Sequence, residues 1–248
     1  MLFQDAEFYS KNSNVQASEA MSLLVSIGLE LKNEPLLDIG CGDGKISDCM
    51  RQLGAKVTGI DVSKPMIDYA KECFPEVKFF NIDAANIDEL CDRFSIITSF
   101  NCLHWIKDID LVLSGVRNKL DGNGIFLGVI YPRCEELWKA AELLETSEEY
   151  RDEAVGFSNP YQFHTLTSFK QLLVSAGFSE VDIWQKPRST TFPNSESFKR
   201  YIQGWLPHCK HFSSSFIDDW TKNYCKLTNQ QESSALTMSY DAVYFAAQ

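Results

Sequence analysis

Short apolar runs alternate with segments of helical spacing between residues 35 and 131. A run of four to eight apolar residues between turn signals is typical of a buried strand, whereas apolar residues that recur every three or four positions predict a helix. Strands joined through crossover helices form a parallel sheet. The pattern predicts strands at 35–40, 55–61, 76–83, 93–101 and 124–131, and helices at 46–53, 63–74 and 109–120.

The pattern loosens after Tyr131. Residues 132–165 are acidic, helix-prone at first and then rich in turn residues, which indicates an insertion over one end of the sheet. A helix at 167–178 and a strand near 180–185 follow, and an aromatic-rich helical stretch precedes a last strand at 240–247. We expect one domain, 1–248, with lid or substrate-binding insertions at 132–165 and 187–235 and an amino-terminal lid helix within 1–30.

The composition limits the class of protein. A chain of 248 residues, 44% apolar, can bury the core of one α/β domain. The sequence has no run of about eighteen apolar residues and no basic-then-apolar start, so we expect a cytoplasmic protein outside the membrane. The net charge of −11 disfavours nucleic acid and anionic membranes as partners. The eight scattered cysteines give neither a metal-site spacing nor a disulfide framework, and a small-molecule substrate is the expected partner.

The stretch "LLDIGCGDGKIS", at residues 36–47, carries the first chemical signal. Glycines that follow a parallel strand let the backbone approach a ligand at the carboxyl end of the sheet. A dinucleotide loop is usually spaced G-x-G-x-x-G and faces a pyrophosphate, but this loop is spaced G-x-G-x-G and has Asp38 and Asp43 beside it. Two carboxylates favour a cationic ligand, such as a sulfonium that carries an α-amino group.

Further acids end the next two predicted strands. Asp61 follows the second strand, where a carboxylate can accept both hydroxyls of a ribose, and Asp83 follows the third, where it can meet an adenine amino group. Asp43 has a structural alternative, because an aspartate there can cap the following helix. Four acids at consecutive strand ends are nevertheless hard to explain by packing, and they predict a ligand site.

The segments "LLDIGCGDGKIS", "VTGIDVSKPMIDYA", "FFNIDAANI" and "SFNCLHWIKD", taken in order, resemble the class I S-adenosylmethionine-dependent methyltransferases over residues 36–131. The resemblance implies a Rossmann-like seven-stranded α/β sheet with helices on both faces, an antiparallel last strand, and a helical lid over the carboxyl ends of the strands. It also implies S-adenosylmethionine as the cofactor and S-adenosylhomocysteine as the product.

The same resemblance implies a set of cofactor-binding residues. Asp38 and Gly40 would lie by the methionine moiety, and Asp61 would hold the ribose. Asp83 with Ala84 would reach the adenine. The remaining residues of the implied set are Cys41, Gly42, Val62 and Asn101.

A narrower resemblance concerns the methyl acceptor. The segments "FYSKNSNVQASEAMSLL" and "SFNCLHWIKDID" resemble those of insect juvenile hormone acid methyltransferases, and the whole layout is more distantly similar to trans-aconitate methyltransferases. Both groups esterify carboxylates. In the first group a glutamine of the amino-terminal segment and the tryptophan of the L-H-W motif bind the substrate carboxylate, and these fall on Gln16 and Trp105. Beyond Tyr131 no match is clear, so the identity of the acid does not carry over.

The favoured function is therefore methyl transfer to a small carboxylic acid. The amide of Gln16 and the indole of Trp105 are neutral donors that hold a carboxylate without protonating it. A carboxylate is already ionised at neutral pH, so its in-line attack on a sulfonium methyl group needs no general base. Without the resemblance, Gln16 is also compatible with an ordinary exposed helix residue, and Trp105 with a core residue.

Three other functions stay open. A small-molecule N- or hydroxyl-directed methyltransferase would need a base, for which His104 is the candidate, although a histidine beside Trp105 is also compatible with packing. A nucleic-acid or protein-amide methyltransferase would be expected to carry an N-P-P-Y type motif where this chain has "NCLH". A non-catalytic protein would bind S-adenosylmethionine without turnover. The sequence does not predict the oligomeric state.

Overall fold

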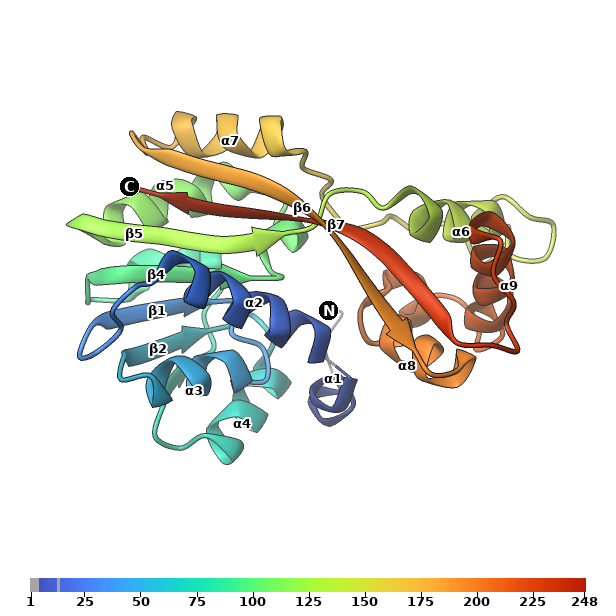
Figure 1. Cartoon of the computed structure of the whole chain (residues 1–248), viewed down its shortest axis with the longest axis horizontal. Helices are drawn as coiled ribbons and strands as arrows, with labels where there is room; N and C mark the ends of the chain where they lie inside the picture. The colour runs from blue at the N-terminus through green and yellow to red at the C-terminus, as the bar shows by residue number, and fades with distance from the viewer. Residues whose placement is uncertain (1–4, 13) are drawn as a thin grey trace.

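A computed structural model describes residues 5–12 and 14–248 of the chain. The chain forms a seven-stranded sheet of order β3-β2-β1-β4-β5-β7-β6, which confirms the Rossmann-like fold expected from the sequence (Figure 1). Strands β1 to β5 pair in parallel, and β7 is antiparallel to both β5 and β6. The strands are β1 (Pro35–Ile39), β2 (Lys56–Ile60), β3 (Lys78–Phe80), β4 (Phe94–Phe100), β5 (Leu120–Ile130), β6 (Val181–Phe192) and β7 (Leu236–Ala247).

Helices cover both faces of the sheet. One face packs against α2 (Asn14–Ile27), α3 (Lys45–Gln52) and α4 (Lys64–Cys73), and the other packs against η1 (Ala84–Glu89), α5 (Ile109–Lys119) and α7 (Leu166–Ser175). No helix within the described ranges is long and apolar enough to cross a membrane. The remaining helices are α1 (Ala6–Asn12), η2 (Leu103–Trp105), α6 (Glu135–Glu145), α8 (Ser195–Trp205), η3 (Pro207–Lys210) and α9 (Phe216–Thr228).

Strand β1 shows why the central strands read as nearly continuous apolar runs. Leu37 packs into the cluster with α5 and α7, and Leu36 packs into the opposite cluster with α2 and α3. Because successive side chains of a strand point to opposite faces, a strand covered on both sides needs apolar residues at nearly every position. The exception is Asp38, a buried carboxylate immediately before the glycine loop.

The last two strands leave the sheet as a long ribbon. β6 and β7 pair over their whole length, from Val181 with Ala247 to Phe192 with Leu236. β7 pairs with β5 only between Val243 and Ala247, so the remainder of the two strands extends beyond the sheet edge (Figure 1). An isolated two-stranded ribbon is only marginally stable in water, and here helices pack against its outer half.

The outer half of the ribbon carries a second hydrophobic core. We call the part that contains α6, residues 146–165, α8, η3, α9 and the outer ends of β6 and β7 the helical subdomain. Its core is aromatic, with Phe198, Phe216 and Trp220 fully buried. The indole Nε1 of Trp220 donates to the carbonyl of Leu137, 3.1 Å away, and so ties α9 to α6. The helical subdomain lies beyond the carboxyl ends of the parallel strands (Figure 1).

The boundaries of the second insertion differ from the expectation. Residues 187–192 belong to β6, and the last strand begins at Leu236 rather than Tyr240. Much of the ribbon is exposed, so its sequence "KPRSTT" lacks the apolar pattern of a core strand. The fifth strand also begins earlier than the expected residue 124, because α5 ends at Lys119 and β5 begins at once with Leu120.

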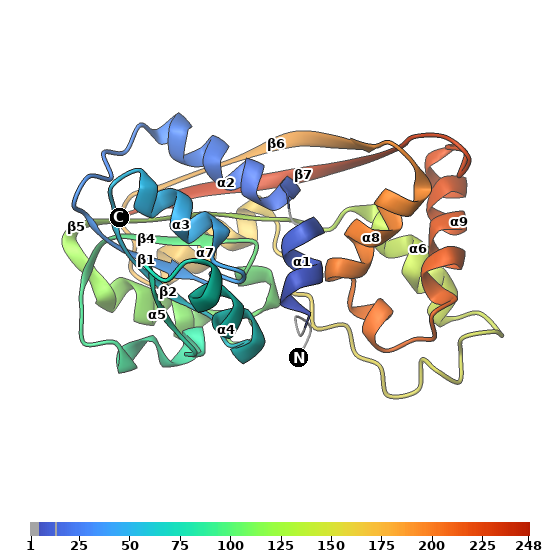
Figure 2. The same ribbon diagram turned by 90° about the horizontal axis from the view of Figure 1, so that it is seen from below.

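In the segment 1–30, for which an amino-terminal lid helix is expected, the structure describes two helices with different surroundings. In α2, the side chains of Ala20, Leu23 and Leu24 are buried in the core cluster of one sheet face, so this helix belongs to the core. Only α1 leaves the sheet, and it contacts both α4 and α8 (Figure 2). A lid role for the amino-terminal segment is therefore confined to α1 and its neighbourhood.

Candidate active site

The glycine loop after β1 is shaped by packing on one side and open on the other. A Cβ atom at Gly40, where φ is +72°, would lie 2.3 Å from the Sγ atom of Cys102, so glycine is needed for the loop to meet the segment after β4. Gly42 also has a positive φ, +54°, but a Cβ there would meet only the ring of Tyr9, at 4.0 Å. Cys41 between them is buried. The loop thus presents open backbone at Gly42.

Asp38 fixes this loop to its surroundings. Its carboxylate accepts hydrogen bonds from Ser47 Oγ at 2.5 Å and from Thr98 Oγ1 at 2.9 Å, which join the end of β1 to α3 and β4. Burial raises the pKa of Asp38 to about 6, although both hydrogen bonds act in the opposite direction. Both carboxylate oxygens therefore have protein partners.

Asp61 lies directly after β2 and also faces the loop. One oxygen accepts from the backbone N–H of Gly42 at 3.0 Å, and the other accepts from Ser63 at 2.7 Å. Burial raises the pKa of Asp61, and these two backbone donors oppose the rise. A carboxylate has about four acceptor sites, so each oxygen keeps capacity for a ligand hydroxyl.

The neighbouring strand end offers an apolar and a polar surface. Val62 is 50% exposed at the end of β2, and Ala84 is buried at the start of η1. Asp83 is exposed and caps η1 by accepting from the backbone N–H of Ala85 at 2.9 Å. These residues could hold the flat face and the amino edge of a purine.

Asp43 completes the acidic edge. Its Oδ1 accepts from the backbone N–H of Lys45 at 3.3 Å, whereas the N-cap of α3 is Gly44. Its Oδ2 is buried with no hydrogen-bond partner among the residues that the structure describes, and the Lys45 ammonium lies 3.7 Å away. A buried carboxylate oxygen of this kind is a partner for a cation. The four aspartates, Asp38, Asp43, Asp61 and Asp83, therefore fit a cationic nucleoside such as S-adenosylmethionine.

Helix α1 covers this loop. The ring of Tyr9 lies over Gly42, and the Lys45 side chain donates to the backbone carbonyl of Ser10. Figure 2 shows α1 between the sheet and the helical subdomain. The glycine loop and the acidic edge are thus partly closed off from solvent by an element that precedes the sheet.

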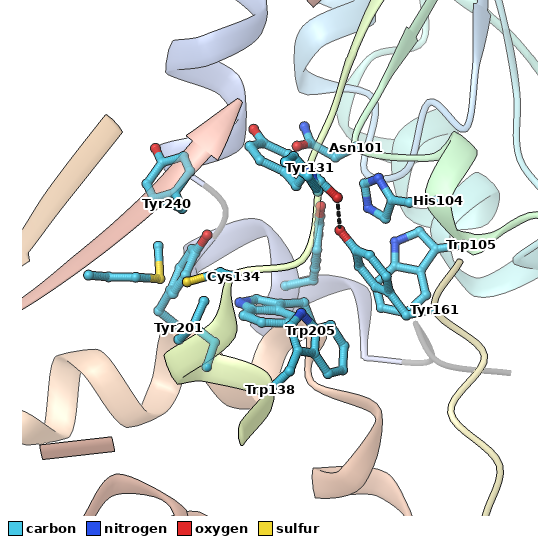
Figure 3. A pocket seen from close by; sticks show the side chains of 14 residues that line it. Asn101, His104, Trp105, Tyr131, Cys134, Trp138, Tyr161, Tyr201, Trp205 and Tyr240 are labelled. Carbon is cyan, nitrogen blue, oxygen red and sulfur yellow. Dashed lines mark hydrogen bonds between the residues drawn. The ribbon is translucent and has the colours of Figure 1, made fainter. Parts of the chain in front are cut away.

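A deep pocket lies next to the loop, between the sheet and the helical subdomain (Figure 3). It encloses about 650 Å³ of atom-free space, its open mouth included. Its walls come from α1, the segments after β4 and β5, α6, α8 and β7. The lining residues are Tyr9, Asn101, His104, Trp105, Tyr131, Pro132, Cys134, Leu137, Trp138, Tyr161, Tyr201, Trp205, Met238 and Tyr240.

Ring contacts fix the wall that follows β4. Tyr161 stacks on His104 with ring centroids 4.6 Å apart and meets Trp105 edge-on at 4.8 Å. Its hydroxyl donates to the backbone carbonyl of Tyr131 at 2.9 Å. Offset and edge-on aromatic pairs of this kind hold one another in place, so these rings define the shape of the wall.

His104 is uncharged in this setting. It is 3% exposed, and burial lowers its pKa to about 3, with a smaller effect from the nearby His164. Its Nδ1 atom is buried and has no hydrogen-bond partner in the described part of the chain. At neutral pH the ring is a neutral hydrogen-bonding group and a very weak base.

Further buried polar atoms of the pocket wall lack partners within residues 5–12 and 14–248. They are Asn101 Oδ1, Tyr131 OH and Trp205 Nε1. Burial raises the pKa of Tyr131, so its hydroxyl stays protonated and can donate. No lysine or arginine appears among the described residues that line the pocket. The pocket therefore offers aromatic surface and neutral hydrogen-bonding groups.

The structure brings three of the sequence-predicted residues together. Asn101, His104 and Trp105 all line the pocket, and Asn101 has a positive φ of +58° in the turn after β4. Asp38, Asp61 and Asp83 lie at the strand ends beside it. Gln16 falls in α2, but its side chain lies outside the described residues.

Tyr131 was not predicted to belong to the site, although it follows the fifth strand directly, and its place at a strand end is a signal of the kind that singled out Asp61. Trp205 stands in the aromatic-rich stretch before the last strand, where aromatic residues are compatible both with a lid core and with the wall of an apolar pocket. Only the fold of the helical subdomain brings it to the pocket.

The fold and the site define an α/β enzyme that binds a cationic nucleoside at the carboxyl edge of its sheet. Comparison with known proteins agrees. The model of a methyltransferase domain family matches residues 37–128, which covers β1 to most of β5. Juvenile hormone acid O-methyltransferases of Drosophila melanogaster and Bombyx mori are 22% and 21% identical to this chain. The two alignments each cover 91% of it, with 84% and 86% of those proteins.

Comparison with solved structures concerns the fold. Phosphoethanolamine N-methyltransferase 2 of Haemonchus contortus, in complex with S-adenosylhomocysteine, superposes with a TM-score of 0.58 at 20% identity. The superposition covers 93% of this chain and 52% of that one, and shows the same fold. The chain is an S-adenosylmethionine-dependent methyltransferase of class I. Its cofactor is S-adenosylmethionine, and S-adenosylhomocysteine is the product.

Proposed function

We propose that this methyltransferase acts on the carboxylate of a small, largely apolar acid and forms a methyl ester. One observation carries the proposal. The pocket beside the glycine loop is walled by aromatic rings and neutral hydrogen-bonding groups, and its histidine is too weakly basic to remove a proton from an acceptor. An acceptor that is already ionised at neutral pH suits such a site.

When bound, S-adenosylmethionine supplies a methyl group on a positively charged sulfur. Asp38, through the loop that it fixes, and Asp43 favour a cation at that edge, and the open backbone at Gly42 gives room for its approach. Asp61 is placed to accept ribose hydroxyls with the oxygen capacity that its two backbone donors leave. The other residues proposed to contact the cofactor are Gly40, Cys41, Val62, Asp83, Ala84 and Asn101.

The acceptor carboxylate would be oriented by uncharged groups. Trp105 and Tyr131 line the pocket. The indole of Trp105, the hydroxyl of Tyr131 and the amide of Gln16 are the three proposed donors. His104, neutral at this depth, can donate through Nδ1 when that nitrogen carries its proton. Neutral donors place the carboxylate for in-line attack and leave its charge in place, so the residues orient the nucleophile and need not activate it.

Exclusion of water from the pocket would further raise the rate of methyl transfer. Water competes for the same donors and solvates the charge of a weak nucleophile, so an enclosed site favours transfer. Helix α1, through Tyr9, and the helical subdomain both contribute walls to the pocket. The two insect relatives support the proposal, because their names describe O-methylation of an acid.

A competition screen tests the proposal. A panel of carboxylic acids, each matched with the primary alcohol and the primary amine of the same skeleton, is offered with methyl-labelled cofactor. We expect transfer to acids alone. Transfer to an alcohol or an amine in preference to its matched acid would favour an N- or hydroxyl-directed enzyme, and binding of cofactor without transfer to any acceptor would favour a non-catalytic protein.

Trp105→Phe provides a matched variant, because it keeps an aromatic ring and removes the indole donor. Loss of one hydrogen bond to a charged group should lower kcat/KM for the best acid about 10–150-fold. Affinity for S-adenosylhomocysteine should stay unchanged. An undiminished kcat/KM would remove Trp105 from the acceptor site.

A further inference from the structure

One unpaired donor of the pocket lies far from the strand ends. Trp205 is the last residue of α8 in the helical subdomain, whereas Asn101, His104 and Tyr131 follow β4 and β5. Its indole Nε1 is buried without a hydrogen-bond partner in the described part of the chain. Figure 3 places Trp205 on the side of the pocket opposite Asn101. The pocket therefore has unpaired polar atoms at both ends.

A buried indole N–H normally finds an acceptor, and that of Trp220 in the same core does so. Trp220 Nε1 donates to the carbonyl of Leu137 at 3.1 Å. The ring neighbours of Trp205 are Trp138, edge-on at 5.9 Å, and Tyr201, edge-on at 6.4 Å. These contacts fix the plane of the indole and leave its N–H unpaired, which is unfavourable unless a ligand supplies the acceptor.

The chemistry of this end of the pocket limits what the ligand group can be. Leu137, Trp138 and Met238 are among the residues that line the pocket, and no lysine or arginine of the described residues lines any part of it. A second charge on the ligand would lose its hydration there without a partner of opposite sign. An uncharged oxygen can accept the indole N–H at far smaller cost.

We propose that Trp205 is a specificity-determining residue that donates from Nε1 to an uncharged oxygen at the end of the acceptor distant from its reacting group. The preferred acceptors are then elongated apolar acids that carry a second oxygen, as a carbonyl, an ether or a hydroxyl. The inference rests on the proposed function for the identity of the reacting end.

The size of the effect follows from the unpaired donor. A site that is built to pair a buried N–H discriminates against a ligand that lacks the acceptor, because the donor stays desolvated and unsatisfied. We expect an acid with a correctly placed oxygen to bind about 5–150-fold more tightly than its hydrocarbon counterpart. In Trp205→Phe this preference should disappear.

The probes are dodecanoic acid and a series of analogues in which an ether oxygen replaces one methylene group at successive positions along the distal half of the chain. They are titrated into the protein loaded with S-adenosylhomocysteine and labelled with nitrogen-15. The protein has five tryptophans, and the indole signal that disappears in Trp205→Phe belongs to Trp205. We expect at least one analogue to bind more tightly than dodecanoate and to move this proton signal downfield, while dodecanoate does not.

Trp138→Phe is the matched control, because it removes another indole of the same pocket whose N–H is not among the unpaired buried donors. It should weaken dodecanoate and its analogues by similar factors, whereas Trp205→Phe should weaken only the preferred analogue. Circular dichroism and thermal denaturation establish that both variants fold.

Two results separate the possible failures. If the acids bind but no analogue gains affinity or moves the Trp205 signal, the indole meets water or only packs, and the inference is overturned while the carboxylate proposal stands. In the second result, neither dodecanoate nor any of its analogues binds. Whether the matched alcohol or amine binds instead, or neither of them binds, the proposed function then fails and the inference fails with it.

Discussion

The protonation state of His104 separates the two small-molecule chemistries. Burial lowers the pKa of this histidine to about 3, so the ring stays neutral at every pH above that value. A hydroxyl acceptor with a pKa near 10 would have to give its proton to a base about seven units weaker. That transfer is uphill by about 10 kcal/mol, since each pKa unit corresponds to about 1.4 kcal/mol. The structure therefore gives His104 no useful role as a general base.

The expected pH profile follows from these values. A carboxylic acid ionises near pH 4, and His104 near 3, so both have finished titrating below pH 6. The chemical step should be flat from about pH 6 to 8 and should slow only as acidification protonates the acceptor. His104→Asn should slow the step about 2–10-fold, the worth of one neutral hydrogen bond.

Single-turnover rates with the best acid from the screen provide the measurement, because steady-state rates also contain binding and product release. His211→Asn is the matched control, since it makes the same substitution at an exposed histidine of the helical subdomain. A rate that climbs through pH 6 to 8 and falls about 100-fold or more in His104→Asn would refute the reasoning, because a general base contributes that much.

Three further predictions concern the strand ends. Asp61→Asn should weaken the binding of S-adenosylhomocysteine about 10–150-fold in calorimetry, because one hydrogen bond to a carboxylate is lost. Asp68→Asn is the control, since Asp68 is an exposed carboxylate of α4 that pairs with a lysine, and it should leave the affinity unchanged. Equal affinities of the parent protein and Asp61→Asn would remove Asp61 from the ribose site. Tyr131→Phe should raise KM for the acid about 10-fold or more with little change in cofactor affinity, and an unchanged KM in steady-state kinetics would show that its hydroxyl does not meet the acceptor. Asp38 has a pKa of about 6 when folded against 3.8 in the unfolded chain, so its stabilising contribution is complete below about pH 4 and is lost as the pH rises through 6. Urea denaturation of Asp38→Asn should therefore show a stability relative to the parent protein that is higher by about 2 kcal/mol at pH 7.5 than at pH 4.5, and a pH-independent difference would contradict the raised pKa.

The cofactor half of the molecule could be predicted because its signals are local. The end of a buried strand can be read from its apolar run, and in a parallel sheet all such ends meet at one edge. The proximity of Asp61 to the glycine loop could therefore be predicted from the order of the strands in the sequence. Their hydrogen bonds could not be foreseen, and the carboxylate of Asp38 proves to be occupied by Ser47 and Thr98.

The acceptor pocket could be predicted only in part because its walls are distant in the sequence. Tyr9, Tyr131 and Trp205 line the same pocket because the long ribbon of β6 and β7 places the helical subdomain beyond the strand ends. The ribbon itself is largely exposed, so it lacks the pattern of a core strand. For the same reason α2 could not be told from a lid helix, since its burial depends on the sheet face that it covers.

The alkali stability of the transferred methyl group distinguishes a carboxylate acceptor from a hydroxyl or nitrogen acceptor. The protein is incubated with methyl-labelled S-adenosylmethionine and the best acid from the screen, and the isolated product is treated with mild alkali. The account predicts a methyl ester, so the label should be released as methanol and the original acid recovered. Label that stays bound to the acceptor through alkaline treatment would indicate an ether or an N-methyl group, and would contradict carboxylate methylation.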